Sequence, residues 1–210
     1  MATGFASKTA RKTADRPEPA EGPKPYLLTV KQFEAMIGAG IFAEGEHVEL
    51  LGGELIQKMT KFDAHNFGVD VIAAAFRAML PTGWIAREEK PVVLDDLSRP
   101  EPDIVVARGP RDLYRHRSPN SKDIALIAEV ADTSYAEDRI KKWVRYAAAK
   151  VSVYVILNIR ERRLELYRKP YGRGASAKYR ESLIFDESAE MPVFVEGVEV
   201  GRIAVRGVLA

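Results

Sequence analysis

The most regular apolar pattern in the chain is the run IALIAEVA at residues 124–131, where both sides of an extended strand would be apolar. Such a strand is typical of the middle of a sheet that is covered on both faces. Glu129 is the residue that breaks this pattern. Because an unpaired carboxylate is costly to bury, Glu129 is expected to have a strong cationic partner, to be protonated or to bind a metal ion.

Helices are predicted from capping residues and from helical spacing. Thr29 with Gln32 forms a capping box that opens a helix, and Ser134 with Glu137 forms a second, whose helix should span about 135–149. A further helix is predicted over 62–80, where five residues share one face: His65, Val69, Ile72, Phe76 and Met79.

Strands are predicted from apolar runs bounded by turn residues. They are expected at 84–94, 102–107, 123–131, 151–158, 162–169 and 178–185, with two short strands around Gly52 and Gly53. The helix at 135–149 would cross over between the strands at 123–131 and 151–158. This order predicts an α/β protein with a mixed sheet flanked by helices.

Composition sets limits on domain organisation and chemistry. Residues 1–25 are rich in proline, small and charged residues, which predicts a disordered tail before a single domain at 26–210. No apolar stretch approaches the roughly 20 residues needed to cross a bilayer, and the first residues lack the apolar centre of a secretory signal, so a cytoplasmic protein is expected. The absence of cysteine excludes disulfides, thiolate nucleophiles and cysteine-ligated zinc.

The net charge of +2 comes from the tail, because the chain from residue 25 onward has 27 basic and 27 acidic residues. Basic residues nevertheless cluster at 108–122, where only Asp112 opposes them. They are Arg108, Arg111, Arg115, Arg117 and Lys122. Such a patch can attract a polyanion such as DNA, and the alternative interpretation is a solvated loop.

A second carboxylate lies at the edge of another doubly apolar strand, because Pro102-Asp103 precedes Ile-Val-Val-Ala. If the two strands are neighbours, Asp103 and Glu129 would converge on a hard divalent cation such as Mg²⁺, which takes one or two carboxylates and completes its coordination with water and substrate phosphate. The alternatives are a strand-entry residue for Asp103 and a buried ion pair with Lys or Arg for Glu129.

Several motifs, in this order and spacing, resemble one family. They are VELLGGELI from Val48, His65 at a helix start, PDIVV from Pro102, IAEVADTS from Ile127, Asp138 with Lys142, YAAAKVSVYVI from Tyr146, LELYRKP from Leu164 and a late IAV at 203–205. Over residues 26–206 the chain resembles the Uma-type restriction endonucleases, a bacterial domain family placed in the PD-(D/E)XK nuclease superfamily.

The resemblance implies a restriction-endonuclease-like core with extra N- and C-terminal strands, and hydrolysis of DNA phosphodiester bonds that depends on Mg²⁺ or Mn²⁺. Asp103 and Glu129 would be the metal ligands. The superfamily signature expects a lysine where Ala131 stands, and in Uma-type sequences that lysine lies on the next helix, at Lys142 here. Supporting roles are implied for Glu49, His65 and Asp138. Because His65 also lies on the apolar face of its helix, the alternative for it is a core or capping histidine. A homodimer is expected by analogy with nucleases that cut both strands.

The helical phase of 135–149 predicts that Lys142 lies on a polar face, opposite Ile140 and Trp143 and outside the core. The alternative for Lys142 is an exposed ion pair with Asp138. Two other functions also remain open: a nuclease-fold protein that binds nucleic acid or a partner without cutting, and an assembly role without nucleic acid. No P-loop or dinucleotide fingerprint supports a nucleotide cofactor.

Overall fold

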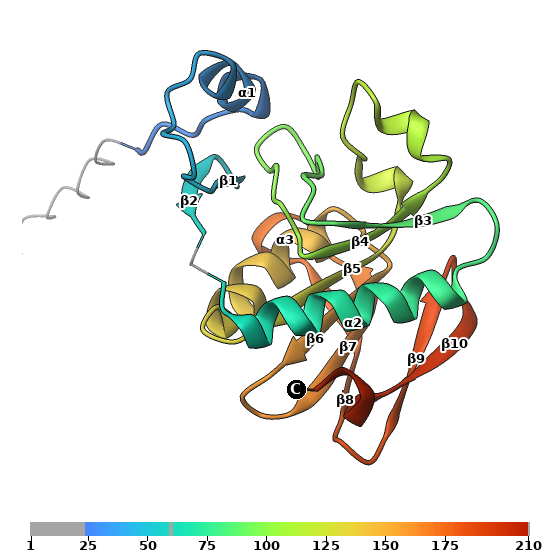
Figure 1. Cartoon of the computed structure of the whole chain (residues 1–210). Helices are drawn as coiled ribbons and strands as arrows, with labels where there is room; N and C mark the ends of the chain where they lie inside the picture. Colours follow the sequence, from blue (N-terminus) through green and yellow to red (C-terminus); the bar gives the residue numbers. More distant parts are fainter. Residues whose placement is uncertain (1–23, 59–60, 210) are drawn as a thin grey trace, which may run out of the picture.

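The computed structural model describes residues 24–58 and 61–209 (Figure 1). Its main elements are α1 (Val30–Gly38), β1 (Val48–Leu51), β2 (Glu54–Gln57), α2 (Asp63–Met79), β3 (Trp84–Glu88), β4 (Ile104–Arg108), β5 (Ile124–Ala131), a π-helix (Glu137–Lys142), α3 (Trp143–Ala148), β6 (Val153–Asn158), β7 (Arg163–Tyr171), β8 (Lys178–Phe185), β9 (Glu190–Val195) and β10 (Val198–Ala204). The predicted tail lies outside the described residues except for 24–25. Of the helices described, none is both long and apolar enough to span a membrane.

A six-stranded sheet forms the centre of the fold, in the order β3-β4-β5-β6-β7-β8. β5 and β6 are parallel, whereas the other neighbouring pairs are antiparallel. A parallel pair needs a crossover connection, and the π-helix with α3 provides it. The predicted mixed α/β sheet and its crossover are therefore confirmed. The hairpins β1-β2 and β9-β10 form separate two-stranded sheets.

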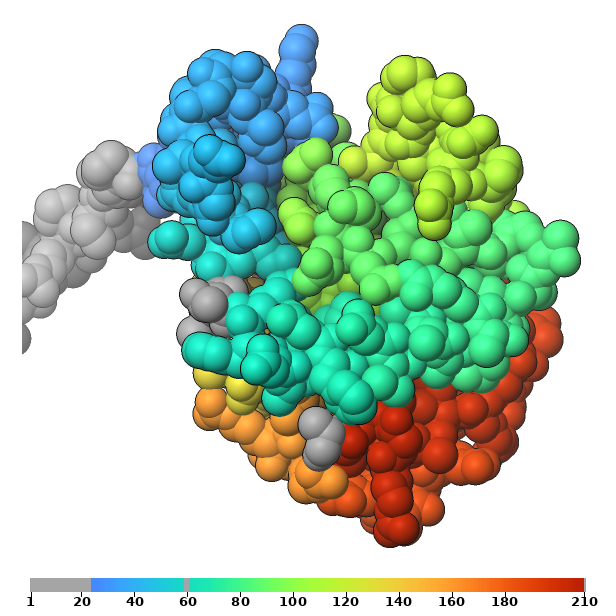
Figure 2. Space-filling view, viewed as in Figure 1, coloured from blue at the N-terminus to red at the C-terminus, as the bar shows by residue number. Residues whose placement is uncertain are grey.

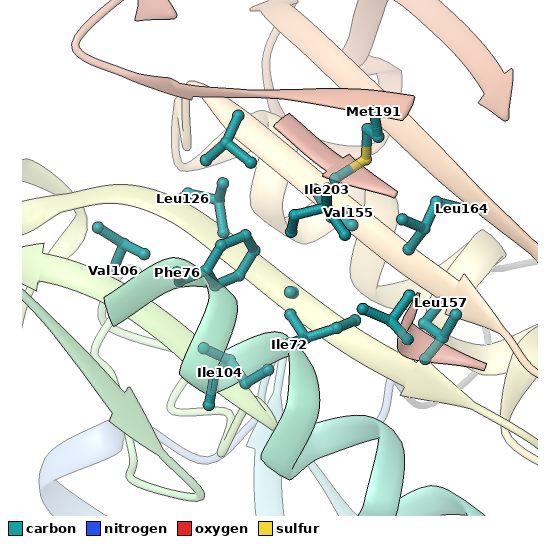
Figure 3. Close-up of a cluster of buried hydrophobic side chains, with 14 of the residues drawn as sticks. Ile72, Phe76, Ile104, Val106, Leu126, Val155, Leu157, Leu164, Met191 and Ile203 are labelled. Atoms are coloured by element: carbon teal, nitrogen blue, oxygen red, sulfur yellow. The ribbon is translucent and has the colours of Figure 1, made fainter. Parts of the chain in front are cut away.

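One apolar core lies between α2 and the sheet (Figures 1 and 3). Ile72 and Phe76 of α2 are fully buried against strand residues such as Leu126, and Met191 and Ile203 from the β9-β10 hairpin complete the cluster. The helical face predicted over 62–80 is confirmed, since its members are buried or half-buried. Burying one such side chain contributes roughly 1.5–3 kcal/mol, so this packing fixes α2 against the strands.

A second core, rich in tyrosine, lies on the other face of the sheet under the π-helix and α3. Tyr146 and Tyr154 stack edge to face with ring centres 4.9 Å apart. Their hydroxyls leave the apolar layer: Tyr146 donates to Glu129 Oε1 at 2.7 Å, and Tyr154 donates to the Asp138 carbonyl oxygen at 3.1 Å. Buried tyrosine hydroxyls need such partners, so this core also orients the acidic residues above it.

The segment after β5 departs from the predicted α-helix. Residues Glu137–Lys142 form a π-helix, whose i→i+5 hydrogen bonds add a residue per turn and shift the helical phase. As a result Ile140 is 65% exposed and Lys142 only 6% exposed. The predicted core position of Ile140 and the predicted position of Lys142 outside the core are both wrong. The ion pair of Lys142 with Asp138 is present, but it is buried.

The turns agree with the predictions in part. Gly52 and Gly53 have φ of +61° and +86°, as a two-residue turn between antiparallel strands requires, and they connect β1 to β2 as expected. The strand predicted at 84–94 is shorter, because β3 ends at Glu88 and Glu89 adopts a φ of 47°.

Candidate active site

Asp103 and Glu129 meet at one end of their strands. β4 begins directly after Asp103, and its first residue, Ile104, pairs with Ala128 beside Glu129. The Asp103 N–H donates to Glu129 Oε2 at 3.2 Å, and the Val130 N–H donates to Asp103 Oδ2 at 2.8 Å. Both carboxylates are buried. The two strands are neighbours, and they place the two carboxylates side by side.

Lys142 lies among three carboxylates. Its Nζ is 3.1 Å from Glu129 Oε1. Asp138 Oδ1 and Glu49 Oε1 lie 3.3 and 3.6 Å from the same nitrogen. The π-helix brings Lys142 and Asp138 into this cluster, and β1 contributes Glu49 from a distant part of the sequence. Because all four side chains are buried, their charges interact strongly.

Further donors fix these carboxylates. The Ser134 hydroxyl, predicted to cap a helix with Glu137, donates instead to Asp138 Oδ2 at 2.6 Å. The Glu101 N–H donates to Glu49 Oε2 at 3.0 Å. Together with the Tyr146 hydroxyl on the Glu129 carboxylate, these bonds hold the cluster in one arrangement.

The outer side of Asp103 is lined by residues near the start of α2 and the end of β3. Lys61 Nζ lies 2.8 Å from Asp103 Oδ1 and 2.5 Å from Glu89 Oε1. His65 Nε2 lies 3.3 Å from the same Asp103 oxygen, yet it is buried without a hydrogen-bond partner among the described residues. Ligand atoms of His65, Glu89 and Asp103 lie within 4.8 Å of one another, which would suit a bound cation.

The predicted catalytic and supporting residues line a single cleft: Glu49, His65, Asp103, Glu129, Asp138 and Lys142. Figure 1 shows why they meet, since the β1-β2 hairpin and the N-terminal end of α2 lie on the same side of the sheet. Lys61 also lines the cleft, and its side chain is 24% exposed. The inner carboxylates are therefore buried but face a space that opens to solvent.

Burial and neighbouring charges shift the pKa values of the ionisable groups deepest in the cleft. Burial raises the pKa of Glu129 to about 8, and the nearby charges of Asp103 and Asp138 act in the same direction. The Lys142 ammonium opposes that shift. Although burial acts to lower it, the pKa of Lys142 lies well above its usual range because of the surrounding carboxylates. Lys142 is therefore held in its charged form.

Asp103 is held in its ionised form. Although burial acts to raise it, the pKa of Asp103 lies well below its usual range, because His65 and Lys61 lie beside the carboxylate. The cleft thus contains four buried carboxylates, those of Glu49, Asp103, Glu129 and Asp138. The ammonium of Lys142 is buried among them and that of Lys61 lies at the rim. Since the raised pKa of Glu129 favours its protonated form at neutral pH, a bound divalent cation would stabilise the ionised form of this carboxylate.

The basic loop 108–122 lies at the other end of the same strands, because it connects the end of β4 to the start of β5. Arg108 pairs with Glu196, and Arg117 pairs with Asp123 at 2.6 Å. Arg115 is 3.5 Å from Asp112 on the exposed surface. Arg111 and Lys122 have no ion-pair partner within the described chain. The loop therefore does not join the cleft, and part of its charge is already paired.

Sequence reasoning missed Lys61, Glu89 and the role of Tyr146. Lys61 and Glu89 lie in connecting segments, where apolar periodicity carries no information. Tyr146 follows Lys142 by four residues, a spacing at which helical side chains are neighbours, and this signal could have identified it.

Comparison with known proteins agrees with the fold. The crystal structure of a putative nuclease belonging to DUF820, from Anabaena variabilis ATCC 29413, is similar with a TM-score of 0.62 and 15% identity, covering 86% of this chain and 97% of that chain. At that identity the likeness shows the fold, which is that of a nuclease-like α/β protein. The chain belongs to the Uma2 family, described as "Putative restriction endonuclease", whose model matches residues 30–206. No curated protein matches the chain.

Proposed function

We propose that this protein is a DNA endonuclease that hydrolyses phosphodiester bonds with the help of Mg²⁺ or Mn²⁺. Family membership and the nuclease fold support a nuclease. One observation supports metal-dependent cleavage of DNA in particular. The buried carboxylates of Asp103 and Glu129 are adjacent in one open cleft, and the Lys142 ammonium lies 3.1 Å from Glu129.

The residues present fit a divalent cation. Carboxylate oxygens are the ligands that Mg²⁺ and Mn²⁺ prefer, and the cleft has more buried carboxylates than buried ammonium groups. The buried Nε2 of His65, which lacks a hydrogen-bond partner in the described part of the chain, lies beside Asp103 and could add a nitrogen ligand. Asp103 and Glu129 would hold the ion, His65 would add a third ligand, and water and substrate phosphate would complete the coordination.

Each residue of the cluster has a role under this proposal. A divalent ion, when bound, supplies an activated water and neutralises charge on the phosphate. Lys142 presents a fixed positive charge that stabilises negative charge developing on the substrate. Glu49 and Asp138 keep Lys142 charged and in place. Lys142 thus takes the role of the lysine that the superfamily signature expects at the position of Ala131.

A second candidate is a nuclease-fold protein that binds DNA without cutting it. Lys61 favours this candidate, because its Nζ contacts both Asp103 and Glu89 and so occupies space that a cation would need. Binding of DNA without any binding of Mg²⁺ or Mn²⁺ would support it. DNA contact through the loop 108–122 and a homodimer remain predictions.

Cleavage of supercoiled plasmid DNA tests the main proposal. The full chain should nick the plasmid with Mg²⁺ or Mn²⁺ and not with EDTA, and Asp103→Asn or Glu129→Gln should lower the rate by at least about 10³-fold, because each removes a metal ligand. Asp132→Asn is the matched control, since Asp132 lines the same cleft but pairs with Arg160. Metal-independent cleavage, or equal rates in all three variants, would overturn the proposal.

A further inference from the structure

A second concave site lies along β3, the edge strand of the central sheet. It is formed by β3, the C-terminal end of α2 and the 3₁₀ turn Arg111–Tyr114. Figures 1 and 2 show the segment 111–122, in yellow-green, as a lobe that rises beside β3. Five basic side chains line this site: Arg77, Arg87, Lys90, Arg111 and Arg115.

The carboxylates of this pocket are already paired. Glu88 forms an ion pair with Arg77, and Asp112 lies 3.5 Å from Arg115. The other three basic side chains, Arg87, Lys90 and Arg111, have no ion-pair partner anywhere in the described chain. Their positive charge is therefore available to an anion from outside the protein.

Arg87 distinguishes this pocket from an ordinary basic surface, because part of its side chain is buried. Its guanidinium lies 4.7 Å from the centre of the Tyr114 ring, and that of Arg117 lies 5.0 Å from the same ring. The Nη1 of Arg87 is buried and has no hydrogen-bond acceptor among the described residues. A buried donor without an acceptor is unfavourable, so this nitrogen is prepared for a ligand that supplies one.

Repulsion between the positive charges of Arg87 and Arg111 also favours a bound anion. Burial and the positive charge of Arg111 both act to lower the pKa of Arg87. An anion between the two guanidinium groups would relieve that repulsion. Guanidinium groups bind phosphate through parallel N–H donors, and the planar Arg87 is already oriented by stacking on Tyr114.

The pocket is connected to the candidate active site through β3. Arg87 precedes Glu89 by two residues, a distance of about 7 Å along an extended chain. The Glu89 N–H donates to the Asp103 carbonyl oxygen at 2.9 Å, so the end of β3 is joined to the metal-binding strand. A phosphate at Arg87 would thus lie along β3, between the cleft and the loop 108–122.

We propose that the pocket formed by Arg87, Arg111 and Tyr114 is a phosphate-binding subsite, which holds a phosphate of the nucleic-acid substrate other than the scissile one. This inference rests on the proposed function for the identity of the substrate. The phosphate belongs either to the nucleic-acid backbone or to a 5′ end, and the shared chemistry is a phosphate oxygen accepting from Arg87.

Metal-free DNA binding tests the subsite independently of cleavage. Binding of a fluorescent DNA duplex to the full chain in EDTA should weaken about tenfold in Arg87→Gln at low salt. The slope of log affinity against log salt should fall by about one, as expected for one lost phosphate contact. Arg180→Gln is the matched control, because Arg180 also stacks on a tyrosine, Tyr171 at 4.7 Å, but on the opposite edge strand, β8. It should match the wild type.

Inorganic phosphate provides a second probe. It should raise the melting temperature of the wild type and of Arg180→Gln, and not that of Arg87→Gln. The DNA-binding measurement is made on duplexes with and without a 5′ phosphate. A tenfold loss of affinity in Arg87→Gln for the phosphorylated duplex alone would assign the pocket to a terminal phosphate. The same loss for both duplexes would assign it to the backbone. Equal DNA affinity and salt slope in Arg87→Gln and Arg180→Gln would overturn the subsite, even if plasmid cleavage stands. Arg87-dependent binding without cleavage would support the subsite and contradict the nuclease proposal.

Discussion

Glu165 and Glu129 are both almost fully buried on strands of the same sheet, yet their surroundings differ. Glu165 accepts hydrogen bonds from the Tyr135 hydroxyl at 3.0 Å, from Arg163 at 2.8 Å and from the Tyr167 hydroxyl, and the guanidinium of Arg139 lies 3.7 Å away. One negative charge thus faces two guanidinium groups and two hydroxyls. Glu165 therefore has its partners within the protein.

Around Glu129 the neighbouring charged groups are mostly carboxylates. With Glu49 and Asp138 it surrounds the ammonium of Lys142, it lies beside the buried carboxylate of Asp103, and it faces the cleft. A buried carboxylate whose partners all come from the protein has a structural role. A buried carboxylate in an excess of negative charge, facing a cleft, indicates a cation site.

The two clusters also share one segment of the chain. Tyr135 and Arg139 contact Glu165, whereas Asp138 and Lys142, from the same stretch, contact the Glu129 cluster. The Glu165 cluster therefore anchors the π-helix that carries the proposed catalytic lysine.

The largest combined effect on cleavage rate and stability is expected from Lys142→Ala. The cleavage rate should fall by about 10²–10³-fold, because a fixed positive charge near the phosphate is lost. The metal-free protein should also lose about 3–5 kcal/mol of stability, since removing one partner of a buried ion pair leaves uncompensated carboxylates. Single-turnover cleavage and urea unfolding measure the two effects.

Lys141→Ala is the control for that variant, because Lys141 is exposed and its Nζ lies 3.8 Å from Glu137. It should change both quantities little. Small and equal losses from the two substitutions would place the catalytic lysine elsewhere. Added Mn²⁺ should restore stability more in Lys142→Ala than in the wild type, because the cation replaces the missing charge.

Glu165→Gln sharpens the contrast between the clusters. It should destabilise the protein by about 3 kcal/mol, because it leaves the surrounding guanidinium groups without their buried partner. The affinity for Mn²⁺ should change by no more than about twofold. Urea unfolding and a metal titration test both statements, and a large loss of metal affinity with unchanged stability would reverse the roles assigned to the two clusters.

A smaller effect is expected from Lys61→Ala. Lys61 Nζ competes with a cation for Asp103 Oδ1 and Glu89 Oε1, so its removal should tighten Mn²⁺ binding by about tenfold. Lys58→Ala is the control, because Lys58 donates to the Glu101 carbonyl oxygen and not to these carboxylates. Weaker Mn²⁺ binding in Lys61→Ala would make Lys61 part of the site and not a competitor.

The smallest effect concerns the loop 108–122. Charge reversal of Arg115 and Arg117 to Glu should weaken DNA binding severalfold and flatten its salt dependence, as loss of phosphate contacts does. Arg206→Glu, an exposed arginine near the C-terminus, serves as the control. An unchanged salt slope in the double variant would return this loop to the solvated-surface interpretation.

Much of the fold could be predicted because apolar periodicity reports burial directly. The run 124–131 identified β5, and the single charged residue within it identified Glu129. The π-helix could not be predicted in this way, because a phase based on 3.6 residues per turn assumes α-helical geometry throughout. That assumption placed Lys142 outside the core.

The pattern also could not separate Glu129 from Glu165, which likewise interrupts an apolar strand, RLELY. The difference lies in partners that other elements supply, such as Arg139 for Glu165 and Glu49 near Glu129. Function here depends on long-range contacts, which residue spacing along a strand does not report.

A calorimetric titration of the full chain with Mn²⁺ tests the central claim most directly. The wild type and Glu165→Gln should bind Mn²⁺ saturably, and both Asp103→Asn and Glu129→Gln should bind it at least tenfold more weakly. Thermal unfolding of each variant verifies that it is folded. Unchanged Mn²⁺ affinity in folded Asp103→Asn and Glu129→Gln would contradict the assignment of this cleft as a metal-dependent active site.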